Sequence, residues 1–181
     1  MPGAVFISQP ISESLSPEGT VPAGEVLSFV LPSQVTVAKS LLGKEHAIGA
    51  VVSYPHGLSQ PLIKAAEARL AVGEGASAVA VCVDSQSVGD INRLLPGLIA
   101  ALQGVDEDKG SFVAFLVRPA VQAELENLLT AAVMCGVDGL WCHEDQDLSL
   151  VEKAVDSVAQ THQRAKDLMI LGPEGSDLPV S

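Results

Sequence analysis

Aromatic side chains are scarce in this sequence. Its 181 residues include one Trp, one Tyr and four Phe, which makes 3% aromatic, although 48% of the residues are hydrophobic. The core must therefore be built mostly from Val, Leu, Ile and Ala, which suits short strands buried on both faces. A chain of this length and composition can bury a substantial core, so we expect a single domain over 1–181.

Basic residues are also few. Ten Lys and Arg stand against 22 Asp and Glu, which gives a net charge of −12. An acidic surface repels nucleic acid and anionic membranes and does not concentrate phosphorylated metabolites. We therefore expect no nucleic-acid partner, no membrane partner and no phosphorylated sugar as ligand. The charge either keeps a hydrophobic protein in solution or marks a docking face for a basic partner.

Long apolar runs and targeting signals are missing as well. The apolar stretch Leu94–Val105 is too short to span a bilayer and contains Pro96 and Gly97. No basic segment followed by an apolar one opens the sequence, and its three cysteines lack the spacing of a metal site. These features predict a cytoplasmic protein with reduced thiols.

Apolar runs typical of strands alternate with helical patterns. The strand-like runs are Ala4–Ile7, Val26–Leu31, Ile48–Ser53, Ala78–Asp84, Phe112–Val117, Val137–Cys142 and Leu168–Leu171. The helical patterns are Ser33–Leu42, Pro61–Gly73, Val88–Gln103, Ala120–Met134 and Leu148–Lys166. Pro61 and Pro119 suit first helical turns, and Asp147 is the expected cap of the last helix, whose apolar stripe runs to His162. The alternation predicts βαβ units around a parallel sheet.

Two neighbouring segments carry a family resemblance. Tyr54-Pro55-His56-Gly57 ends an apolar strand, and the following helix reads Lys-x-x-Glu-Ala-x-x-Ala from Lys64, before the pair Gly75-Ala76. This order resembles the third and fourth βα segments of deoxyribose-phosphate aldolase, and the resemblance extends more weakly over Val26 to Leu171. It implies an α/β fold of the TIM-barrel type, an aldehyde-lyase family and a site at the carboxyl ends of the strands.

The catalytic residues of that family are replaced. Where the family has a proton-shuttling Asp and a Schiff-base lysine, this sequence has Ala80 and Trp141, and a second active-site lysine aligns with Ile170. A methyl group cannot transfer a proton, and an indole cannot attack a carbonyl as an amine does. All lysines fall in expected helices or loops. We therefore expect the family's retro-aldol activity to be lost, unless a relocated amine preserves it.

Trp141 is expected to fill the barrel. Side chains alternate along a strand, so Trp141 shares its face with Gly139, whereas Leu140 and Cys142 point towards the helices. The family's lysine at this register points inward, and the indole would occupy the space of a bound sugar.

The loop Cys142–Asp147 is the most polar segment at the expected mouth. His143 and Glu144 could contribute to a metal site, but close spacing on one loop rarely gives a convergent ligand set. The carboxylates otherwise form the solvated first turn of a helix. We therefore predict no metal and no cofactor. Asp145 stands where the family has a phosphate-binding Gly, so the resemblance also implies a lost phosphate pocket.

His56 and Asp84 end the third and fourth strands. With His143 and Glu144 they could support a different chemistry at the same mouth. Cys82, inside an apolar strand, is expected to be a core residue rather than a nucleophile.

The expected barrel is incomplete, with seven readable strands where eight are usual. Residues 9–24 are expected to form an irregular loop, and 172–181 a tail too short for a further helix and strand. A missing strand leaves unpaired edges that a partner can cover. The leading hypothesis is a catalytically impaired deoxyribose-phosphate aldolase-like pseudoenzyme that acts through self-association or association with another protein.

Overall fold

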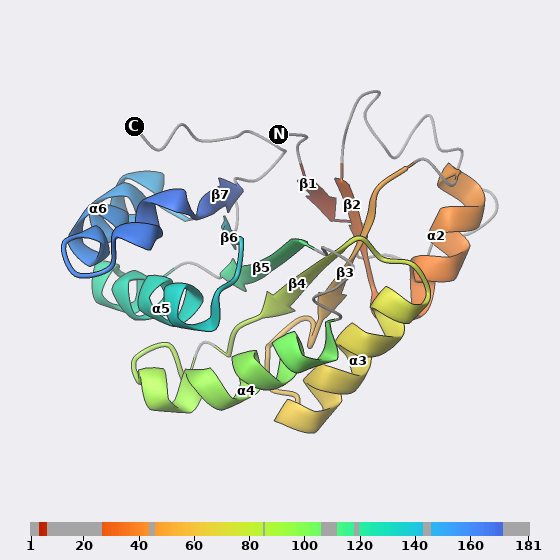
Figure 1. The fold of residues 1–181 in the computed structure, drawn as a ribbon, viewed down its shortest axis with the longest axis horizontal. Coiled ribbons are helices and arrows are strands. Elements are labelled where there is room, and N and C mark those ends of the chain that lie inside the picture. Colours follow the sequence, from red (N-terminus) through yellow and green to blue (C-terminus); the bar gives the residue numbers. More distant parts are fainter. Residues whose placement is uncertain are drawn as a thin grey trace.

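The structure is a parallel sheet surrounded by helices. The computed structural model describes residues 4–6, 27–43, 46–84, 86–105, 112–117, 120–142 and 146–171. Within these ranges the sheet has seven strands in the order β1-β2-β3-β4-β5-β6-β7, and neighbouring strands are parallel. The helices α2 to α6 form an outer arc around the strands (Figure 1). The expected loop at 9–24 and tail at 172–181 lie outside the described residues.

The elements follow the predicted alternation. The strands are β1 Ala4–Phe6, β2 Leu27–Val30, β3 Ile48–Val52, β4 Ala78–Cys82, β5 Phe112–Val117, β6 Gly139–Cys142 and β7 Met169–Leu171. The helices are α2 Val35–Leu42, α3 Pro61–Gly73, α4 Ile91–Gly104, α5 Gln122–Cys135 and α6 Leu148–Ala159, with 3₁₀ segments η1 Pro32–Gln34 and η3 Gln163–Asp167. The TIM-barrel-like α/β class is confirmed. Within the described part of the chain, every helix is too short or too polar to cross a membrane.

The last helix is shorter than predicted. It was expected to continue to Lys166, but α6 ends at Ala159, where the N–H groups of Thr161 and His162 both turn back to the carbonyl of Val158. His162 then precedes η3 in a non-helical conformation. The cap at the other end is as predicted, because the Asp147 carboxylate accepts a hydrogen bond from the Ser149 N–H at 2.9 Å.

Three other α-helices begin later than expected: α2 begins at Val35 instead of Ser33, after the 3₁₀ segment η1, and α4 and α5 also start late. The predicted start of α4 at Val88 is wrong, because Asp90 is extended and caps the helix through the Asn92 N–H. The start of α5 at Ala120 is also wrong. Val121 is extended, and its N–H donates to the Glu124 carboxylate. Pro119 lies outside the described residues, whereas Pro61 opens α3 as predicted.

The two faces of the sheet bury different sets of side chains. The helix-side core joins β-strand residues such as Val79, Val81 and Leu140 to the inward faces of α3 to α6. The opposite face carries a smaller group, which we call the inner cluster: Phe29, Val51, Ala78, Ala80, Cys82 and Trp141, with Met169 packed against it. The inner cluster occupies the face on which barrels of this type place their filling side chains.

Candidate functional site

The inner cluster is centred on two aromatic rings. Phe29 comes from β2 and Trp141 from β6, and their ring centroids lie 4.7 Å apart with the planes inclined at 35°. Phe29 is completely buried, and Trp141 is 6% exposed, which confirms the expected burial of the indole. Since β2 and β6 are separated by three strands in the sheet, the sheet must curl enough to bring their inner faces together.

Small residues make room for these rings. Gly49 on β3 is the register partner of Phe29, and a Cβ atom built on it would lie 2.5 Å from the phenyl Cδ1 and Cε1 atoms. Ala80, which the family resemblance aligns with a proton-shuttling Asp, belongs to the same cluster. The inner face thus combines two large aromatic rings with neighbouring residues that have very small side chains or none.

The residues beside Trp141 face the helices. Leu140 and Cys142 belong to the helix-side core, as the strand alternation predicted. Burial raises the pKa of the Cys142 thiol to about 12. A thiol that stays protonated is a poor nucleophile and a poor metal ligand. The rest of the polar loop, including His143, Glu144 and Asp145, lies outside the described residues.

Ile170, which the resemblance aligns with a second active-site lysine, faces the helices. It pairs with Leu140, whereas Met169 pairs with Gly139. Paired residues of parallel strands point to the same face, so Ile170 joins the helix-side core and Met169 packs against the inner cluster. Ile170, the residue aligned with that lysine, is therefore not an inward-facing residue of β7.

The turn that contains His56 packs against the end of β4. A Cβ atom built on Gly57 would lie 2.5 Å from the backbone nitrogen of Asp84, so only glycine allows this approach. His56 itself is exposed. The Asp84 carboxylate accepts hydrogen bonds from the Gln86 N–H at 2.8 Å and the Ser87 hydroxyl at 2.7 Å. The structure brings the turn and Asp84 together, but the carboxylate oxygens of Asp84 are engaged by its own loop.

Lys64 is a site residue that the sequence reasoning missed. It lies on α3 and is 5% exposed. Burial lowers the pKa of its amine, and the negative charge of Asp84 opposes this shift most strongly. Buried residues recur along α3 at spacings of four and three residues: Lys64, Ala68 and Ala71. That spacing is the sequence signal that could have placed Lys64 on the inward face of the helix.

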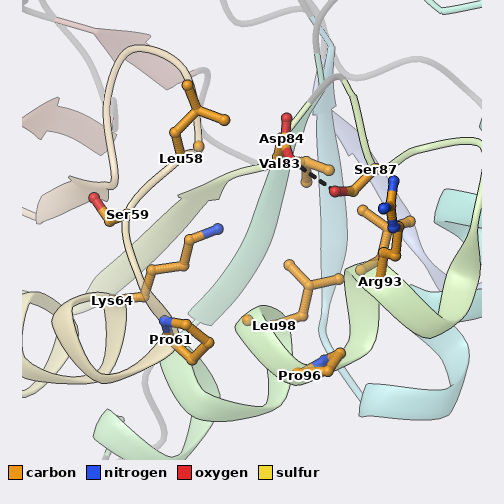
Figure 2. A pocket seen from close by; sticks show the side chains of 13 residues that line it. Leu58, Ser59, Pro61, Lys64, Val83, Asp84, Ser87, Arg93, Pro96 and Leu98 are labelled. Carbon is orange, nitrogen blue, oxygen red and sulfur yellow. Dashed lines mark hydrogen bonds between the residues drawn. The ribbon is translucent and has the colours of Figure 1, made fainter.

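The amine of Lys64 enters a cavity of about 140 Å³ between α3 and α4, at the carboxyl end of β4 (Figure 2). The cavity is lined by Gly57, Leu58, Ser59, Pro61, Lys64, Val83, Asp84, Ser87, Arg93, Leu94, Pro96, Gly97 and Leu98. Val83, Leu94 and Leu98 belong to the helix-side core. The cavity is therefore on the opposite side of the sheet from the inner cluster.

This chain is similar to known proteins in sequence and in structure. The sequence matches no protein-family model. It is 37% identical over 95 residues to the deoxyribose-phosphate aldolase of Corynebacterium glutamicum, a match that covers 50% of this chain and 42% of that protein. The match therefore spans less than half of the length of this relative.

Solved structures share the fold. The aldolase QR15 superposes with a TM-score of 0.68 at 18% identity, covering 94% of this chain and 77% of the other. The deoxyribose phosphate aldolase of Aeropyrum pernix, whose structure is described as a unique tetramer, gives a TM-score of 0.64 at 13% identity, covering 97% and 75%. The curled parallel sheet and its outer arc of helices define an α/β barrel-type fold. Within the 95 matched residues, the sequence is similar to that of a deoxyribose-phosphate aldolase.

Proposed function

We propose that this chain belongs to the deoxyribose-phosphate aldolase family as a non-catalytic member, and that it does not cleave 2-deoxyribose 5-phosphate through a Schiff base. The contact between Trp141 and Phe29 carries this proposal. It fills the inner face with carbon at the positions where the family resemblance places the amine and the proton shuttle. A Schiff-base aldolase needs both groups within reach of one bound carbonyl.

The chemistry of the inner cluster supports the same conclusion. Among the described side chains of this cluster, five are hydrocarbon or aromatic and the sixth is the thiol of Cys82. Displacing the indole to admit a sugar would expose on the order of 200 Å² of ring surface. The incoming hydroxyl groups would then lie against the mostly apolar side chains of this cluster, which is unfavourable.

The second part of the proposal is that the protein associates with copies of itself through α3. Leu62 is 78% exposed and Leu70 is 64% exposed, and Ala66 lies exposed between them at helical spacing. Large apolar side chains in a continuous stripe on one helix mark an association surface. We call Leu62, Ala66 and Leu70 the α3 stripe. A second copy of the chain, presenting the same stripe, would remove it from water on both sides.

Incubation with 2-deoxyribose 5-phosphate and borohydride tests the catalytic part. We expect no acetaldehyde and no reduced adduct on any lysine by peptide mass spectrometry, because no described lysine faces the inner cluster. The C. glutamicum relative, treated in parallel, is the positive control. Cleavage of the sugar together with an adduct on any lysine of this chain would overturn the proposal and identify a relocated amine.

A further inference from the structure

Lys64 of α3 extends its amine into the cavity at the carboxyl end of β4. Its side chain is 5% exposed, and its Nζ atom forms no hydrogen bond or ion pair with any residue in the described ranges. Figure 2 shows the side chain extending from α3 into the cavity, towards the space below Asp84. A buried ammonium group is costly unless a ligand or water completes its hydrogen bonds. The cavity is the space from which water or a ligand can complete the hydrogen bonds of this amine.

The neighbouring helix lies against this amine. A Cβ atom built on Gly97 of α4 would be in ordinary van der Waals contact with Lys64 Nζ, at 3.4 Å. Further along, Gly104 packs directly on the backbone of Ala65, which holds α3 and α4 together and fixes the width of the gap. The cavity of about 140 Å³ has room for roughly four waters at about 30 Å³ each. A group of the size of phosphate or a short carboxylate fits the same space.

The charges around the cavity favour an anion at the amine. Arg93 lies on the side of the cavity away from Lys64, beside Ser87, and is exposed at the rim (Figure 2). Asp84 also lines the cavity and carries a negative charge, which disfavours an anion. Its two carboxylate oxygens, however, already accept hydrogen bonds from the Gln86 N–H and the Ser87 hydroxyl. The Glu67 carboxylate accepts from the Ser53 N–H. Lys64 and Arg93, the two cations that line the cavity, are therefore the groups still available to bind a ligand.

We propose that this cavity is a binding site for a small oxyanion, a carboxylate or a phosphate, held by Lys64 with Arg93 at the entrance. The site is separate from the inner cluster because it lies on the helix side of the sheet. A bound anion would stabilise the ammonium form of Lys64, whose pKa burial lowers in the free protein. Binding therefore raises this pKa, and the affinity decreases as the pH rises through the pKa of the free amine.

Calorimetric titration with inorganic phosphate and, separately, with acetate tests the site and distinguishes the two sources of oxyanion. We expect one of them to bind, and Lys64→Met to weaken that binding by about 10-fold or more, as for a lost hydrogen bond to a charged group. Arg93→Gln should weaken it by about 3-fold, because the rim charge is screened. Lys153→Met, at an exposed lysine of α6, is the matched control and should change nothing. Asp84→Asn should strengthen binding, because it removes the nearby negative charge.

Two results would overturn the site. One is that neither anion binds to the wild-type protein below about 10 mM. The other is that binding is unchanged in Lys64→Met. If Lys64→Met does not fold, as judged by circular dichroism, the pH series on wild-type protein and Arg93→Gln decides instead, and affinity independent of pH would reject the proposal. None of these results affects the cleavage assay, so the two proposals fail separately.

Discussion

At the scale of residues, Phe29 and Trp141 determine what the inner face of the sheet can hold. Their rings meet at a centroid distance of 4.7 Å, although the sequence places them on the second and sixth strands. Gly49 is the smallest possible neighbour and lies under the phenyl ring. Around Gly49, added volume therefore has to displace the phenyl ring.

Gly49→Ala tests this packing. The added methyl group would start 2.5 Å from the phenyl ring, so we expect the free energy of unfolding to decrease by about 1–3 kcal/mol, as for other overpacked cores. Gly73→Ala is the matched control, since a Cβ atom built there meets nothing within 4 Å. It should be neutral or stabilise α3 by up to about 1 kcal/mol. Urea denaturation measures both, and an equal effect of the two substitutions would contradict a filled interior.

Sequence reasoning predicted the direction of Trp141 but not its partner. The direction follows from the alternation of side chains along one strand, which is a local property. The contact with Phe29 depends on how far the whole sheet curls, and no local pattern encodes that. Lys64 was missed for a related reason. Its charge suggested an exposed position, while its burial depends on the approach of α4 at Gly97.

At the scale of elements, polar side chains decide where the helices begin and how the loops are held. Gln146 is buried in the connection between β6 and α6. Its Oε1 atom accepts from the Ala120 N–H at 2.8 Å, and its Nε2 group donates to the carbonyls of Ala120 and Asp147. One amide thus joins the loop before α5 to the loop before α6. The alternation of strands and helices was predictable from the sequence, but such contacts between loops were not.

Gln146→Glu tests this connection. The substitution keeps the shape but replaces the donating amide by a carboxylate that faces two carbonyl groups. We expect a loss of about 1–3 kcal/mol in the free energy of unfolding near neutral pH, since buried acceptors lose their donor. Gln160→Glu, at the exposed end of α6, makes the same chemical change without buried partners and should stay within about 0.5 kcal/mol of the wild type. Urea denaturation measures both variants. If they unfold at the same urea concentration, Gln146 does not connect the loops.

At the scale of the whole molecule, the fold is a curled sheet with an apolar helix face left in solvent. Within the described residues, β1 pairs only with β2 and β7 only with β6. The α3 stripe adds exposed apolar surface on the outer layer. Both features support the proposed self-association.

Light scattering tests association. We expect a mass above the 18.7 kDa of one chain at micromolar concentration. The double substitution Leu62→Gln and Leu70→Gln should shift the protein towards the monomer, because it makes the α3 stripe polar. The pair Val37→Gln and Met134→Gln changes exposed apolar residues on α2 and α5 and should leave the mass unaltered. A wild-type mass equal to one chain would reject self-association.

The fluorescence of Trp141 tests the filled interior most directly, because it is the single tryptophan of the sequence. With the indole 6% exposed against Phe29, we predict emission clearly blue-shifted from that of free tryptophan in water and little quenching by iodide. Unfolding in urea should restore both the water-like emission and the quenching. Water-like emission and ready quenching by iodide in the folded protein would contradict the account, because they would show an indole in solvent and an open interior.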